Sequence, residues 1–280
     1  MLTDPRAYQI ASLAALLAYG MLRLDFGVPA ERVAVLVATA LGAQYALTRL
    51  AGLPRFDPKS ALISSLSLCL LLRTGSLGLA AAAALVTIAS KFLIRARGKH
   101  VFNPVNFGLV AMLLVSDAVW VSPGQWGSPA LLAFLVACLG LVVVNRAARG
   151  DVTFAFLLAY SGLLAARALW LGDPWRVPLH QLTSGALLIF AFFMISDPKT
   201  TPDSRAGRFL FAAAVALAAA YVQFVVYRPN PLLWALAACS PLVPFVDRLL
   251  PGPRYEWPTA GRPAAAAVVP SGALTREAHA

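Results

Sequence analysis

Apolar residues come in long blocks along the chain, and short polar segments rich in Pro, Gly, Asp and Arg separate them. Such blocks are typical of membrane-spanning helices. They predict about ten spans, several of them short, at residues 7–24, 31–50, 60–73, 77–95, 104–116, 129–145, 152–171, 180–196, 207–226 and 231–250. The pattern therefore predicts an all-α polytopic membrane protein.

The blocks form a transmembrane domain, residues 1–250, and residues 251–280 follow as a tail dominated by Pro, Ala and Gly. We expect this tail to be disordered, because it has too few large apolar residues to bury. Most of the 23 Lys and Arg residues fall at the two ends of the chain or in alternate loops. The positive-inside rule then places the chain in the inner (plasma) membrane with both termini in the cytoplasm.

The transmembrane domain contains a repeat, with one copy at about residues 7–116 and the other at about 129–250. The motif NPVNFGL begins at Asn103, and NPLLWAL begins at Asn230. Five spans per copy is an odd number, so the two copies would cross the membrane in opposite directions. Inverted repeats hold their binding site near the membrane midplane, between the halves.

The proline break at Asn103-Pro104 marks the candidate site. Pro lacks an N–H and disfavours helix in the residue before it, so a helix should begin near Pro104 with Asn103 as its cap. Free N–H groups, Asn103 and Asn106 would then lie at membrane depth beside Phe107. Polar groups there are tolerated when they line a cavity. An amide beside an aromatic ring suits a planar heterocycle such as a flavin, or a urea-like solute; the alternative is a plain helix break at the membrane surface.

Other candidate residues surround this break in the expected fold. Small residues lie two spans before each Asn-Pro motif, at Ser60 and at Ser184-Gly185. Asp197, followed by Pro198, Lys199 and Thr200, ends the eighth span. Asp197 could hold a cation at the cytoplasmic end of the site, or these residues could simply mark the end of a membrane span. The candidate binding set is Ser60, Asn103, Pro104, Asn106, Phe107, Ser184, Gly185, Asp197, Thr200 and Asn230.

The net charge of +11 raises the question of nucleic acid. The Lys and Arg residues stand at span ends and not on an aromatic-interleaved face, so they favour anchoring to the lipid bilayer over nucleic acid. The densest cluster is Lys91, Arg95, Arg97 and Lys99, which could bind anionic lipid, a phosphate group or an acidic cytoplasmic subunit.

Motifs of hydrolysis and nucleotide binding are missing from the sequence. It has no Ser-His-Asp order, Walker loop or GxGxxG motif after a strand. His100, His180 and His279 are too scattered for a metal site. These absences give no support to hydrolysis or to nucleotide binding, and we expect no catalytic residue.

The stretch SGALLIFAFFMISDPKTTPDSRAGRFLF resembles the RnfD subunit of the Rnf electron-transport complex and the NqrB subunit of the Na⁺-translocating NADH:quinone oxidoreductase (the RnfD/NqrB family). His180, Ser184-Gly185-Ala186, Ser196-Asp197-Pro198, Thr200 and Gly207-Arg208 match that family's pattern. Earlier, Ser60-Ala61-Leu62, Lys91, Phe102-Asn103-Pro104 and Gly108 agree with it, as does the closing Pro244-Phe245-Val246-Asp247. The likeness extends over about residues 55 to 255.

This resemblance implies a ten-span, urea-transporter-like fold and a flavin-carrying subunit that relays electrons across the membrane with partner subunits. Family members attach FMN to a Thr in the loop between spans 5 and 6. Here that connection is SDAVWVSPGQWGSP, from Ser116 to Pro129, and it contains no Thr. We therefore expect covalent FMN to be absent and riboflavin or FMN to bind non-covalently. The alternative is a channel or carrier for a small polar solute without redox chemistry.

Overall fold

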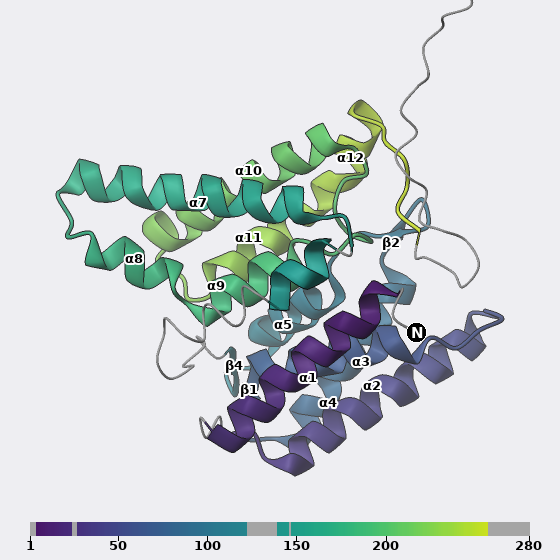
Figure 1. Cartoon of the computed structure of the whole chain (residues 1–280). Coiled ribbons are helices and arrows are strands. Elements are labelled where there is room, and N and C mark those ends of the chain that lie inside the picture. The colour runs from purple at the N-terminus through teal and green to yellow at the C-terminus, as the bar shows by residue number, and fades with distance from the viewer. Residues whose placement is uncertain (1–3, 24–26, 122–138, 146, 257–280) are drawn as a thin grey trace, which may run out of the picture.

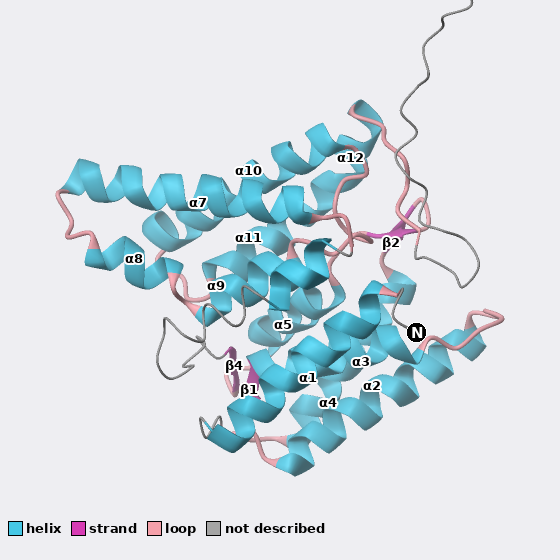
Figure 2. Ribbon diagram, in the orientation of Figure 1, coloured by secondary structure: helices cyan, strands magenta, loops and turns pink. Residues whose placement is uncertain are grey.

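The computed structural model describes residues 4–23, 27–121, 139–145 and 147–256 (Figure 1). Most of the expected sixth span and residues 257–280 of the expected tail lie outside this part. Helices make up nearly all of the regular structure (Figure 2). Apart from that sixth span, each expected block falls on a helix or a bent pair of helices.

Within the described residues, four helices are long and apolar enough to cross a membrane: Ala30–Leu50, Gly150–Leu171, Arg205–Val226 and Pro231–Leu249. The pair Arg176–Leu182 and Gly185–Met194, bent by 46°, gives a fifth if it is one span. Three shorter apolar helices are Pro58–Leu71, Leu77–Leu93 and Pro104–Val115. The chain is thus a mostly helical, polytopic membrane protein; ten spans and an inverted repeat stay predictions.

Helices of the first part of the chain pack in a group in the lower part of Figure 1. In this group α2 packs on α3 and α4, α1 packs on α3, and α4 packs on α5. The bounds are α1 (Pro5–Arg23), α2 (Ala30–Leu50), α3 (Pro58–Leu71), α4 (Leu77–Leu93) and α5 (Pro104–Val115).

Helices of the later part form a second group, above the first in the same view. Here α7 packs on α10, α10 on α11, and α11 meets α5 between the groups. The bounds are α7 (Gly150–Leu171), α8 (Arg176–Leu182), α9 (Gly185–Ile189), the π-helix η1 (Phe190–Met194), α10 (Arg205–Tyr221), the π-helix η2 (Val222–Val226), α11 (Pro231–Cys239), the 3₁₀-helix η3 (Ser240–Leu242) and α12 (Val243–Leu249).

Two helices of the first group are too short to cross a bilayer. Helices α3 and α5 have 14 and 12 residues, or about 21 and 18 Å at 1.5 Å per residue, against about 30 Å of hydrocarbon. Each is followed by an extended segment, β1 (Leu72–Thr74) after α3 and β4 (Val119–Val121) after α5, and these strands pair antiparallel. This pairing provides hydrogen-bond partners for backbone N–H and C=O groups, which lipid could not provide.

A second pair of short strands, β2 (Arg95–Ala96) and β3 (Lys99–His100), connects α4 to α5. The chain after α12 returns to this hairpin, where Arg254 Nη2 donates to Arg97 O at 3.1 Å. Thus residues 251–256, the first of the expected tail, lie against the bundle.

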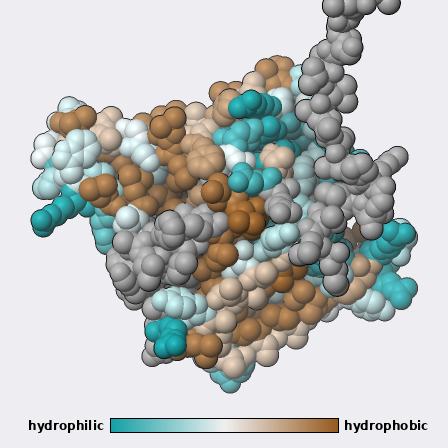
Figure 3. Space-filling view, viewed as in Figure 1, coloured by the Kyte–Doolittle hydropathy of each residue, from teal (hydrophilic) through white to brown (hydrophobic). Residues whose placement is uncertain are grey.

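Large apolar side chains lie on the outside of the helices. Leu158 and Trp170 of α7 are 78% and 84% exposed, and Leu217 of α10 is 59% exposed. Figure 3 shows broad hydrophobic areas over the helices of both groups. Lipid would cover such surfaces, as expected for a membrane protein.

Candidate functional site

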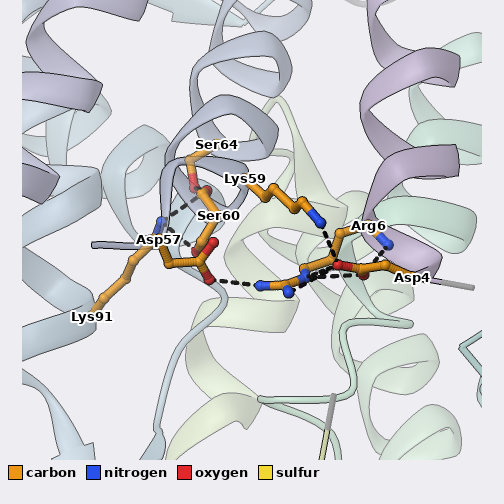
Figure 4. A network of polar contacts seen from close by, with 7 residues as sticks. All are labelled: Asp4, Arg6, Asp57, Lys59, Ser60, Ser64 and Lys91. Atoms are coloured by element: carbon orange, nitrogen blue, oxygen red, sulfur yellow. Dashed lines mark hydrogen bonds and ion pairs between the residues drawn. The ribbon is translucent and has the colours of Figure 1, made fainter. Parts of the chain in front are cut away.

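A polar network joins the starts of α1 and α3 (Figure 4). Arg6 bridges Asp4 at 2.9 Å and Asp57 at 2.6 Å, and Lys59 Nζ lies 2.7 Å from Asp4 Oδ2. Burial alone would raise the pKa of Asp4, but hydrogen bonds from Arg6 and Lys59 lower it to about 2. The network holds the first residues of the two helices together beside a cavity.

This cavity, which we call the central cavity, has a volume of about 300 Å³ and lies between the two groups of helices. The first group contributes α1, α2, α3, α4 and the start of α5, and the second contributes η1 and the turn after it. Its polar lining includes Gln9, Gln44, Ser60, Ser64, Ser67, Lys91, Asn103, Asp197 and Lys199, and its apolar lining includes Val143, Val144, Phe192, Phe193 and Met194.

Lys91 is the most unusual residue of the lining. Lys91 is only 6% exposed. Its Nζ donates to Ser60 O at 3.0 Å and to Ser60 Oγ at 3.1 Å. Within the described residues no carboxylate lies within 4.0 Å of this ammonium group. The nearest compensating charges are therefore not paired directly with it, although Asp57 and Asp197 line the same cavity. A buried cation without a direct ion pair is costly, so an electron-rich group placed beside it would be stabilised.

Asn103 stands at the start of α5, where the sequence places it. Its Oδ1 accepts from Asn106 N at 3.1 Å, so the predicted N-cap is confirmed. Its Nδ2 donates to Met194 O at 3.3 Å and to Asp197 Oδ2 at 3.4 Å. Because of these bonds, one amide connects the two groups of helices at the cavity wall.

The turn after η1 supplies Asp197, one of the two acidic residues in the described lining of the cavity; the other is Asp57. Burial raises the pKa of Asp197, against the hydrogen bond from Lys199 N and the positive charge of Lys91. Thr200 Oγ1 donates to Asp197 O at 3.3 Å. Thr200 therefore shapes this turn and does not line the central cavity.

Asn106 and Phe107 lie away from the cavity lining. Asn106 is fully buried, and both polar atoms of its side chain lack a hydrogen-bond partner in the described structure. Phe107 packs against Phe102, with ring centroids 5.2 Å apart. The aromatic residues that border the cavity are Phe192 and Phe193, from the other group of helices.

A second cavity, which we call the outer cavity, holds other members of the predicted set. It measures about 540 Å³ and is lined by Ser184 and Asn230, together with Tyr160 and Gln223, whose side chains hydrogen-bond to each other. Gly185 is buried beside it. Asn230 has positive φ (59°) and makes no side-chain cap bond, unlike Asn103.

The structure therefore divides the predicted residues. Ser60, Asn103, Pro104 and Asp197 line the central cavity, whereas Ser184 and Asn230 line the outer one. Although α5 and α11 are in contact, the starts of these helices do not share one pocket. The π-helix η1 separates the two cavities, and Met194 lines both.

Sequence reasoning did not include Lys91, Gln44 and Ser64 in the site. The sequence could have pointed to Lys91, because a Lys inside an apolar block is rare. Gln44 Oε1 is buried without a partner in the described structure, and only its position in the cavity wall makes it a candidate. Metal chemistry has no support in the part of the chain that the structure describes, where no group of His, Cys, Asp or Glu could hold an ion.

Known proteins similar to this chain agree on one family. The profile of the NQR2, RnfD, RnfE family matches residues 114–255, about half of the chain. A protein of Stutzerimonas stutzeri, named as the D subunit of an ion-translocating oxidoreductase complex, is 32% identical over 148 residues, 52% of this chain and 41% of that protein. Proteins of the same name from Alcanivorax borkumensis and Yersinia pestis are 33% identical over 118 residues and 25% identical over 176 residues. The matched region covers 41% of this chain and 34% of the Alcanivorax borkumensis protein. For the Yersinia pestis protein it covers 63% of this chain and 46% of that protein.

The matched regions thus span less than half the length of these relatives. The family profile nonetheless covers the second group of helices and the turn at Asp197. This chain belongs to the NQR2, RnfD, RnfE family.

Proposed function

We propose that the chain is a membrane subunit of an Rnf- or Nqr-like electron-transport system and that its central cavity holds a flavin without a covalent bond. The relatives are named as the D subunit of an ion-translocating oxidoreductase complex. Partner subunits in the membrane then supply and remove the electrons. The two groups of helices, each with an Asn-Pro helix at the contact between them, support the inverted repeat.

The observation that carries the proposal is the buried ammonium of Lys91 in a cavity that also offers amides. A flavin ring presents carbonyl oxygens and ring nitrogens in one plane, and it accepts and releases electrons one or two at a time. Lys91 would donate to an acceptor of the ring, and Gln44 Oε1, which lacks a partner among the described residues, would accept from a ring N–H.

Apolar residues of the same cavity suit the rest of a ring. Phe192, Phe193 and Met194 border it on the side of η1. Ligand sites typically combine such an apolar wall with a few polar groups that fix orientation, in volumes from about 300 Å³ upward. The cavity is therefore of a size and chemistry that fit a flavin ring.

The absorption spectrum of the purified full-length protein tests this proposal. Protein from flavin-replete cells should show flavin absorbance, and acid precipitation should release the flavin into the supernatant, because no covalent bond holds it. Lys91→Met and Asn103→Ala should each remove most of the absorbance. Arg205→Met is the control, because Arg205 is an exposed cation outside the cavity lining. Colourless protein that also fails to bind added flavin would overturn the proposal.

A channel or carrier for a small polar solute is the competing function. Its support is that the central and outer cavities lie next to each other, with Met194 of η1 in the lining of both. Uptake of urea-sized solutes into liposomes by flavin-free protein would favour this function over electron relay.

A further inference from the structure

A third cavity lies beside the central cavity, on the side of the β2–β3 hairpin. We call it the basic cavity, and its volume is about 260 Å³. Four residues line both cavities: Arg95, His100, Pro198 and Lys199. Residues 254–256, which follow α12 in sequence, supply another part of the lining of the basic cavity. The chain after α12 therefore lies close to the edge of the central cavity.

Residues 251–256, which we call the strap, have no regular secondary structure and run from α12 to the β2–β3 hairpin (Figure 1). At the hairpin, Arg254 Nη2 donates to Arg97 O at 3.1 Å. At the turn after η1, Lys199 Nζ donates to Tyr255 O at 3.1 Å. The hairpin belongs to the first group of helices and the turn to the second, so the strap contacts both groups beside the basic cavity.

Tyr255 gives the strap its main side-chain contact. The centroid of its ring lies 5.0 Å from the guanidinium carbon of Arg149 and 5.9 Å from Lys199 Nζ. Burial raises the pKa of the Tyr255 hydroxyl to about 12, so the ring stays neutral. Cations near the face of an aromatic ring are attracted to it. These contacts hold the ring against the second group of helices.

Gly252 lets the strap approach another part of the backbone closely. A Cβ atom at this position would lie 2.5 Å from Ser204 N and 2.7 Å from Asp203 C. Both atoms belong to the backbone before α10, so neither can turn aside as the end of a side chain could. A single methyl group at Gly252 would therefore displace the strap.

Few contacts hold the strap, and most of its surface is open. None of its six residues is buried, and Pro251, Pro253, Arg254 and Glu256 are exposed. Segments with few buried apolar contacts open locally at a small fraction of the global free energy of unfolding. The strap can therefore leave its position while the helices stay packed.

We propose that the strap is a lid over the basic cavity. When it is closed, it shields His100 and Lys199, at the edge of the central cavity, from water. When it opens, ligands in water on this side reach that edge through the basic cavity. This inference does not rest on the proposed function, because the lid would act on any ligand of the central cavity.

The reactivity of a cysteine at position 100 tests the lid. His100 Nδ1 is buried and has no partner in the described structure. Burial and the positive charges of Arg95, Lys91 and Lys199 lower the pKa of His100 to about 4, so His100→Cys removes no charge at neutral pH. The full-length protein in detergent would be treated with a water-soluble maleimide, and peptide mass spectrometry would follow the label at each cysteine.

Labelling at position 100 should be slow in His100→Cys alone. Adding Gly252→Ala, or Arg254→Ala with Tyr255→Ala, should raise the rate about tenfold or more, because each change releases the strap. Gly162→Ala is the matched control: a methyl group there meets open space, so the rate should stay within about twofold.

Cys69 reports on the packing of the helices in the same samples. It is a free cysteine of α3 with no exposed surface, so its labelling should stay slow in every variant. Fast labelling at position 100 with the strap intact, or a rate that both strap variants leave unchanged, would overturn the inference. A rise that Cys69 shares in both strap variants would also overturn it, because the strap would then hold the helices together and would not be a lid.

Discussion

The side-chain amide of Asn103 donates to a carboxylate oxygen of Asp197 at 3.4 Å, across 94 residues of sequence. The same amide also bonds to Met194 O, and its oxygen caps α5. One side chain thus fixes the start of a helix and its contact with the other group of helices. The wall of the central cavity depends on this junction.

Asn103→Ala should lower the free energy of unfolding by about 1–3 kcal/mol, because it removes the cap and leaves buried polar groups unpaired. Thermal unfolding in detergent would measure the change. Asn230→Gly is the control: Asn230 makes no cap bond and has positive φ, so glycine should change stability by less than about 0.5 kcal/mol. Equal losses in both variants would mean that the junction at Asp197 adds little stability.

Lys91→Met should have opposite effects on binding and stability. Removing a buried cation that forms no direct ion pair in the described structure should leave the flavin-free protein as stable or stabilise it by up to about 2 kcal/mol, while flavin affinity falls. Parallel thermal unfolding and flavin titration would separate the effects. A loss of stability above about 1 kcal/mol would instead indicate that Lys91 mainly stabilises the fold through its hydrogen bonds to Ser60.

Gly108→Ala should destabilise the contact between α4 and α5 by about 1–3 kcal/mol. A methyl group at Gly108 would overlap the Thr87 hydroxyl, which is fully buried. Adding Thr87→Ala should recover much of the loss. Gly162→Ala in α7 has open space and should be neutral or stabilising by up to about 1 kcal/mol. Thermal unfolding of the four variants would compare them.

Stability should fall as the pH drops from about 6.5 toward 4 because of His100. Its pKa is about 4 in the folded protein and 6.5 ordinarily, so in this range the unfolded chain binds a proton that the folded chain excludes. The slope should reach up to about 1.4 kcal/mol per pH unit. His100→Gln should flatten this part of the pH profile of thermal unfolding, and His180→Gln, at an exposed position of α8, should not. An unchanged slope in His100→Gln would assign the effect to other groups.

Local chemistry in the sequence determined the helices and the start of α5. Apolar blocks placed the helices because burial and lipid exposure both follow hydropathy over contiguous residues. Asn103 as a cap and Pro104 as the first helical residue followed from the missing N–H and restricted φ of proline, which act within one turn. The family resemblance likewise rested on motifs that can be read along the chain.

Tertiary packing alone decided which of these residues meet. That Asn103 reaches Asp197, that Lys91 has Ser60 and no carboxylate beside it, and that Asn103 and Asn230 line separate cavities all depend on segments far apart in sequence. The repeated Asn-Pro motif predicted two similar helix starts, yet only the first makes a side-chain cap bond. Backbone preferences extend over a few residues, whereas a cavity wall is set by how whole helices cross and where their side chains fit.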